Sequence, residues 1–304
     1  MPTNEQRRAS AKRKLERQLE RRAKRARTRR ILVIAAGSIV GLAVIAAVVI
    51  AVVNTKDEHK SNTASTSTSP TSPAPGSSAD TTPPANPQNG AVPPLPAFKP
   101  TASVGANCQY PASPEAAAKP VKPPRTGKVP TDQAQVSASM VTSQGNIGLM
   151  LANNESPCTV NSFANLIGQK YFDDTKCHRS TTSPDLSVLQ CGDPKGDGTG
   201  GPGYGFANEY PTDQYPPNDP QLKQPVIYPR GTLAMANSGQ PNSNGSQFFM
   251  VYKDSQLPPQ YTVFGTIQAD GLATLDKIAK AGVAGGGEDG PPAVDVTIKS
   301  LLLD

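Results

Sequence analysis

An uncharged apolar run of 23 residues, at positions 31–53, constrains this chain more than any other feature. Only Gly37, Ser38 and Gly41 interrupt its aliphatic character. As an α-helix rising about 1.5 Å per residue, the run is roughly 34 Å long, enough to cross a hydrocarbon core of about 30 Å. A cleaved signal peptide is the alternative, but its apolar part is usually only about 7–15 residues long. We therefore expect one retained transmembrane helix at 31–53.

The charge is distributed unevenly on the two sides of this run. Residues 1–30 contain 13 of the 30 basic side chains and three of the 24 acidic ones, a net charge of +10, whereas the other 274 residues have a net charge of −4. The positive-inside rule places this basic tail in the cytoplasm and the C-terminal part outside a cell membrane. We expect no nucleic-acid partner for the folded part, because the basic charge lies outside it. The tail itself either sets the topology or binds RNA or anionic lipid headgroups.

Residues 54–130 are rich first in Ser and Thr and then in Pro and Ala, and they contain 16 of the 32 prolines. Such a composition buries too little apolar surface to offset the entropy lost on ordering. We expect a disordered linker at 54–130 that holds a domain away from the membrane.

The remaining residues, 131–304, are enough for one compact domain. Apolar and polar residues alternate over 136–140 and 147–151 around a Gly-containing turn, which predicts a β-hairpin. Apolar residues with helical spacing predict helices at about 157–169 and 270–280. The other apolar runs are short and separated by Gly, Pro and Asn. Many strands with two helices indicate a mainly β fold, a closed antiparallel barrel with helices over its open ends.

Several kinds of reactive site have little support. The sequence from Gly196 to Gly201 fits GxGxxG, but Pro202 follows where a dinucleotide-binding fold would begin a helix. His178 is the only histidine after residue 130, and its neighbour Cys177 would point to the opposite face of a strand. Paired metal-ligand spacings are absent from the sequence. We therefore expect neither a nucleophilic mechanism nor a metal or cofactor.

The four cysteines are Cys108, Cys158, Cys177 and Cys191. An even number outside the membrane is typical of disulfides, because that compartment is oxidising. Four cysteines allow three connectivities, between which a sequence does not decide. We prefer Cys177–Cys191 with Cys108–Cys158. The alternative is that some of the four are free and buried.

Two segments, KCHRSTTSPDLSVLQCGDPKGDGTGGPGYGFANE and GTLAMANSGQPNSNGSQFFMVY, have the His-Arg pair, the glycine-rich loop and the NGSQFF string of one family in the same order. With the VFG that follows them, they make nearly all of 131–304 resemble a cyclophilin. The resemblance implies a closed eight-stranded antiparallel barrel capped by two helices. It also implies peptidyl-prolyl cis–trans isomerisation, for which the partners would be proline-containing segments of exported proteins. The alternative function is a catalytically weak module that binds such segments.

The resemblance also assigns roles to residues. Arg179 matches the catalytic arginine of the family, and Gln190 matches the residue that orients it. His178 matches a contact residue. The other substrate-binding positions that it implies are Ala236, Asn237, Gln247, Phe249, Leu257 and Phe264.

Some positions depart from the family pattern. The segment between Arg179 and Gln190 is about three residues longer than in the family. Alignment on Gln190 places Ser187 where an aromatic residue normally forms a wall of the proline pocket, and the alternative is that Leu186 takes this place if the extra residues fall elsewhere. Gln256 replaces an aromatic residue associated with cyclosporin binding, and Tyr261 replaces a frequent histidine. Loss of an aromatic wall removes about 1.5–3 kcal/mol of apolar burial. We predict a weakened isomerase with poor cyclosporin affinity.

Overall fold

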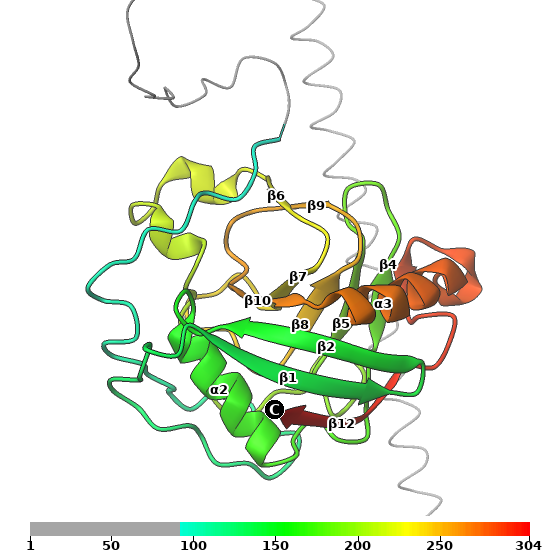
Figure 1. Ribbon diagram of the computed structural model, residues 1–304, viewed down its shortest axis with the longest axis horizontal. Coiled ribbons are helices and arrows are strands. Elements are labelled where there is room, and N and C mark those ends of the chain that lie inside the picture. The colour runs from blue at the N-terminus through cyan, green and yellow to red at the C-terminus, as the bar shows by residue number, and fades with distance from the viewer. Residues whose placement is uncertain (1–91) are drawn as a thin grey trace, which may run out of the picture. The chain divides into compact units, whose positions relative to one another are not determined.

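A computed structural model of the chain describes residues 92–304 (Figure 1). These residues belong to one compact unit. The basic tail, the transmembrane helix predicted at 31–53 and the first part of the predicted linker lie outside the described residues. Within 92–304, no helix has both the length and the apolar character needed to cross a membrane.

The described part is mainly β, as predicted. The strands are β1 (Gln135–Thr142), β2 (Gly145–Ala152), β3 (Thr175–Lys176), β4 (Arg179–Thr181), β5 (Val188–Cys191), β6 (Val226–Tyr228), β7 (Thr232–Met235), β8 (Phe248–Val251), β9 (Ser255–Leu257), β10 (Val263–Ile267), β11 (Asp289–Gly290) and β12 (Thr297–Leu303). Ten of them form one sheet in the order β11-β4-β5-β8-β7-β10-β2-β1-β12-β3, and β6 pairs with β9 separately. Every strand pair is antiparallel.

The sheet curls because a single stretch of chain belongs to both of its ends. Strand β3 pairs with β12, and β4 pairs with β5, yet only two residues separate β3 from β4. The backbone N–H groups of these two residues continue the ladders, since Cys177 donates to the carbonyl of Val296 and His178 to that of Gln190. If β3 and β4 are counted as one bent strand and the short edge strand β11 is left out, the main sheet has eight strands. This matches the number that the resemblance implies.

Two α-helices pack against the curled sheet, close to their predicted positions (Figure 1). Helix α2 (Pro157–Gly168) has proline in its first turn and buries one apolar face that includes Phe163 and Leu166. Helix α3 (Ala269–Ala281) lies against β2 and ends at Gly282, whose φ of 78° favours glycine. Three 3₁₀ turns complete the helical structure of residues 92–304: η1 (Thr212–Gln214), η2 (Pro220–Lys223) and η3 (Ala284–Gly286).

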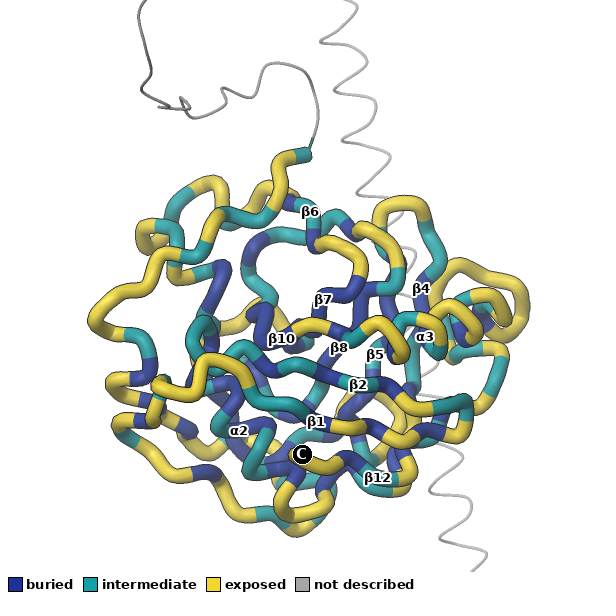
Figure 2. Tube along the Cα trace, viewed as in Figure 1, coloured by how far each residue is buried: buried dark blue, intermediate teal, exposed yellow. Residues whose placement is uncertain are grey.

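The sheet separates two apolar clusters, because successive side chains of a strand point to opposite faces. Leu189 and Met250 belong to the larger cluster, with α2 and most of the barrel interior. Their neighbours Val188 and Phe249 belong to a smaller cluster on the other face. Tyr210 and Tyr228, from the segment between β5 and β7, belong to this second cluster. Figure 2 shows the buried stretches of the strands.

The structure corrects one boundary. Residues 92–130, predicted as part of a disordered linker, form an ordered N-terminal belt around the outside of the domain (Figure 1). Cys108, Tyr110 and Val129 of this belt are buried in the main core. Phe98 packs edge-to-face on Tyr210 with ring centroids 5.6 Å apart. These few buried apolar residues have little effect on the average composition of the segment, so the composition did not indicate them. An extended proline-rich chain can follow the surface of a domain.

Candidate active site

The two predicted catalytic residues lie on neighbouring strands, in a row of paired residues that continues through Phe249. Arg179 on β4 is directly opposite Gln190 on β5, Gln190 is opposite Phe249 on β8, and Phe249 is opposite Ala234 on β7. Residues directly opposite each other in antiparallel strands share a face of the sheet. The fold therefore brings a guanidinium, an amide and an aromatic ring together on the outer face.

The Arg179 side chain is half-buried and has two partners. Its Nε and Nη2 donate to the two carboxylate oxygens of Asp289 at 2.7 and 2.8 Å, and its Nη1 donates to Oε1 of Gln190 at 3.3 Å. The hydrogen bonds raise the pKa of Arg179 and lower that of Asp289. Asp289 lies on β11, the edge strand beside β4. The sequence does not indicate this residue, because an acidic pair in a glycine-rich segment matches no motif of a site.

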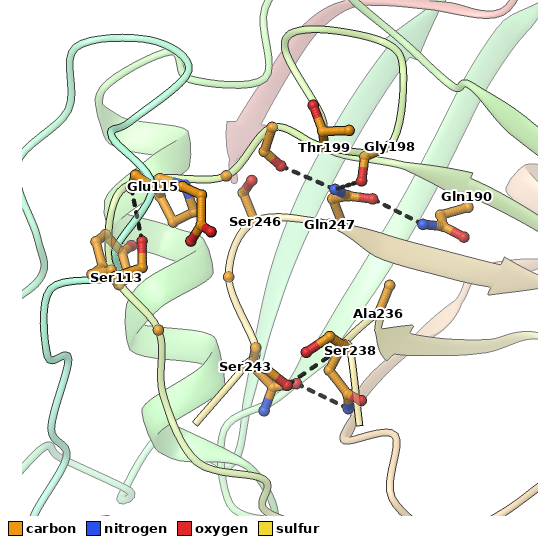
Figure 3. Close-up of a pocket in the computed structure, with 18 residues that line it drawn as sticks. Ser113, Glu115, Gln190, Gly198, Thr199, Ala236, Ser238, Ser243, Ser246 and Gln247 are labelled. Atoms are coloured by element: carbon orange, nitrogen blue, oxygen red, sulfur yellow. Dashed lines mark hydrogen bonds between the residues drawn. The ribbon is translucent and has the colours of Figure 1, made fainter. Parts of the chain in front are cut away.

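A chain of amide contacts continues from Gln190 (Figure 3). Its Nε2 donates to Oε1 of Gln247 at 2.9 Å. The Nε2 of Gln247 in turn donates to the carbonyls of Gly198 and Gly200, both at 3.0 Å. These contacts fix which way each amide faces. As a result Oε1 of Gln190 faces the arginine, where it accepts the hydrogen bond.

His178 lies beside this group, but it does not have the properties of a general base. Both ring nitrogens are buried and have no hydrogen-bond partner within residues 92–304. Burial lowers the pKa of the imidazole, which makes the ring a weaker proton acceptor. That His178 contacts the substrate stays a prediction.

Aromatic and aliphatic side chains gather around Phe249, the residue opposite Gln190 in the sheet. Phe249 is 5% exposed, and Leu257 and Tyr261 pack against its cluster. The rings of Phe249 and Tyr261 meet edge-to-face, with centroids 5.8 Å apart. Ser187 is buried directly before β5, where its hydroxyl donates to the carbonyl of Ser183. Tyr261 therefore supplies an aromatic surface beside Phe249, where Ser187 supplies none.

The prediction that Phe264 lines the same slot is wrong. Its side chain is fully buried in the main core, and its ring contacts that of Phe163 with centroids 5.0 Å apart. The neighbouring Val263 belongs to the outer cluster instead. Strand alternation thus points Phe264 into the barrel, away from Arg179.

A cavity of about 580 Å³ adjoins the hydrogen-bonded side chains of Gln190 and Gln247. Four predicted site residues line it: Gln190, Ala236, Asn237 and Gln247. The Asn237 side chain is fixed, because its Nδ2 donates to the carbonyl of Gln260 at 2.8 Å. The belt contributes two further lining residues, Ser113 and Glu115, to which no sequence motif points. Figure 3 shows them on the side of the cavity opposite Gln190.

All four cysteines are in disulfides, with the preferred connectivity. Cys177–Cys191 joins the residues that flank the catalytic pair, since Cys177 is two positions before Arg179 and Cys191 directly follows Gln190. Cys108–Cys158 joins the belt to the first turn of α2.

Comparisons with known proteins agree with this geometry. A family model described as "Cyclophilin type peptidyl-prolyl cis-trans isomerase/CLD" matches residues 137–302. The chain is 70% identical over 304 residues, 100% of both sequences, to the "Probable peptidyl-prolyl cis-trans isomerase B" of Mycobacterium leprae (strain TN). It is 80% identical over 213 residues to the protein of the same description from Mycobacterium tuberculosis (strain ATCC 25618 / H37Rv), covering 70% of this chain and 69% of that one.

A more distant relative is the "Peptidyl-prolyl cis-trans isomerase B" of Streptomyces anulatus. It is 34% identical over 189 residues, covering 56% of this chain and 97% of that one. The chain belongs to the cyclophilin-type peptidyl-prolyl isomerase family. It is an enzyme that interconverts the cis and trans forms of the peptide bond before proline.

Proposed function

We propose that Arg179 is the catalytic group and that Gln190 positions it. The barrier to rotation about an X-Pro bond, about 18–20 kcal/mol, comes from the lone pair that nitrogen shares with the carbonyl. A twisted amide returns that lone pair to nitrogen, which then accepts a hydrogen bond. A permanently charged guanidinium donates to this nitrogen more strongly in the twisted form than in the planar form. Such a mechanism requires no nucleophile.

The neighbouring residues bind two different parts of the substrate. Phe249, Leu257 and Tyr261 offer the apolar surface for the proline ring. The cavity lined by Ala236, Asn237 and Gln247 holds the adjoining peptide chain while the other side of the bond rotates. The observation that supports this proposal best is the row of Arg179, Gln190 and Phe249 across adjacent strands.

NMR exchange spectroscopy on an Ala-Pro peptide tests the assignment. We expect the full chain, purified in mild detergent, to accelerate cis–trans exchange and Arg179→Ala to abolish most of that acceleration. Arg230→Ala is a matched control, because Arg230 forms a similar ion pair with Asp276 elsewhere on the surface. Equal losses in the two variants would contradict the role of Arg179. Peptide binding without acceleration would instead favour the binding-module alternative.

We further propose that the enzyme is anchored in the cell membrane by residues 31–53 and assists the folding of exported proteins outside it. The apolar run and the +10 charge before it support this orientation. Two disulfides in the described part also suit an oxidising compartment. The substrates would be proline-containing segments of exported chains.

Thiol trapping in intact cells tests the compartment. Cells are quenched with acid and free thiols are alkylated with a bulky maleimide. We expect the wild-type chain to remain unmodified in the membrane fraction. A variant without residues 31–53 is retained in the cytoplasm and should show up to four modified cysteines. Four reactive thiols in the wild-type chain would place the domain in the cytoplasm.

A further inference from the structure

The cavity beside Gln190 and Gln247 has a single charged side chain in its lining. Most of its lining side chains are neutral and polar, with hydroxyl or amide groups, and its lining contains one ionisable acid, Glu115. Glu115 is exposed, and none of the ion pairs within residues 92–304 includes it. No basic side chain lines the cavity. The carboxylate of Glu115 therefore faces the cavity mouth without a neutralising partner.

The belt holds Glu115 in this place through backbone contacts on both sides of it. The N–H of Ser113 donates to the carbonyl of Gly203 at 3.0 Å, and that of Ala118 donates to the carbonyl of Gly201 at 2.9 Å. Between these two bonds, the hydroxyl of Ser113 donates to the carbonyl of Glu115 at 2.9 Å. The belt thus runs alongside the glycine-rich loop that forms another wall of the cavity (Figure 3).

We propose that Glu115 selects substrates that have a Lys or Arg side chain close to the isomerised proline. This inference rests on the proposed function, in which Arg179 and Gln190 mark the reacting end of the site. A peptide held there extends toward Glu115, because Gln190 and Glu115 lie on opposite sides of one cavity (Figure 3). The methylene stem of the basic side chain contacts Ala236 and Pro202, and its cationic head reaches the carboxylate. The net charge of residues 92–304, with 15 basic and 18 acidic side chains, also favours cationic partners.

The test uses the full chain and peptides that differ at a single position. Lys, norleucine or Glu is placed one, two or three residues before proline. Exchange rates and NMR binding titrations are measured for each peptide. An exposed carboxylate gives about a two- to fivefold preference for Lys over norleucine at low salt. Raising the ionic strength from about 0.05 to 0.5 M should remove most of that preference.

Variants connect the preference to Glu115. Glu115→Gln keeps the size of the side chain and should lower the preference to less than about twofold, and Glu115→Lys should reverse it toward Glu peptides. Asp132→Asn, an exposed carboxylate outside the cavity lining, should leave it unchanged. An unaltered Lys preference in Glu115→Gln, or none in the wild type, would overturn the proposal. Selective binding without isomerisation would support the proposal for Glu115 and refute the role of Arg179.

Discussion

Asp289 and Asp276 each form an ion pair with an arginine, and the two pairs are almost equally exposed. Arg179 and Asp289 are 37% and 56% exposed, and Arg230 and Asp276 are 37% and 57% exposed. Both pairs are bidentate. Only the first includes the proposed catalytic group, whose Nη1 remains directed at Gln190 while Asp289 occupies Nε and Nη2. We infer that Asp289 positions the guanidinium.

We predict that Asp289→Asn lowers kcat/KM about two- to fivefold, because an exposed charge pair contributes modestly to holding its partners. The loss should appear in kcat and leave KM unchanged, since Asp289 acts through Arg179. Asp276→Asn should lower the thermal stability by the same small amount as Asp289→Asn, but it should keep full activity. If both variants lose activity to the same extent, Asp289 has no special role. Peptide exchange by NMR and thermal denaturation provide the two readouts.

The same pair has a defined pH dependence. Hydrogen bonds from Arg179 hold the pKa of Asp289 below its ordinary value of about 3.9. A depressed pKa means that the pair is intact above that ordinary value and is lost as the pH falls through the lowered one. Protonation of Asp289 therefore contributes nothing to an activity profile between pH 5 and 8.

Tyr261 offers a second prediction for a single residue. Its edge-to-face contact with Phe249 supplies the aromatic surface that Ser187 lacks. Tyr261→Ala should raise KM about two- to tenfold, because an aromatic pair contributes about 0.5–1.5 kcal/mol beyond its buried area. Tyr261→Phe retains the ring and should remain within about twofold of the wild type. Similar KM values for the Ala and Phe variants would exclude Tyr261 from the apolar slot. Peptide titrations give the comparison.

At the scale of elements, helix α2 begins without a cap from its own sequence. The hydroxyl of Ser156, the N-cap residue, donates to the carbonyl of Val263 instead. The first helical amides, those of Cys158 and Thr159, donate to the carboxylate of Glu209 at 3.0 and 2.7 Å. A residue about fifty positions away therefore satisfies N–H groups that a helix leaves free at its start.

Glu209 makes the stability depend on pH near neutrality. Burial raises its pKa to about 7. An acidic group whose pKa is higher in the folded than in the unfolded protein stabilises the fold most at pH values below the pKa of the unfolded state. This contribution is lost as the pH rises through the pKa of the folded state, about 7. We predict that the free energy of unfolding of the wild type, relative to Glu209→Gln, falls by about 2–3 kcal/mol between pH 5 and 8. Urea unfolding of both proteins at each pH measures this difference in the free energy of unfolding. Asp132→Asn should show no such trend, and a constant difference for Glu209→Gln would contradict the prediction.

The elements that the sequence predicted are those with a repeating pattern. The hairpin of β1 and β2 and the helices α2 and α3 lie within a residue or two of their expected ranges, because each buries one face of a regular period. The two-residue strands β3 and β11 are too short to show any period. Their partners come from chain more than a hundred residues away. For this reason the sequence indicated Arg179 and Gln190 through a resemblance but did not indicate Asp289.

For the whole molecule, the largest difference between sequence and structure is the belt. Its composition predicted a linker up to residue 130, yet the main core includes Cys108, Tyr110 and Val129. Tyr110 also donates from its hydroxyl to the carbonyl of Cys158 at 2.7 Å. Order in the belt depends on these long-range contacts and on one disulfide, and a window of local sequence contains neither.

A truncation at the expected boundary tests whether the belt is part of the folding unit. We predict that the fragment 92–304 unfolds at the same urea concentration as the full chain. The fragment 131–304 should be several kcal/mol less stable, because it exposes the core surface under the belt and loses a disulfide, which alone contributes about 2–4 kcal/mol. It also leaves Cys158 as a free thiol, so alkylation by a maleimide confirms the state of the fragment. Equal urea midpoints for the two fragments would show that the belt adds nothing to stability.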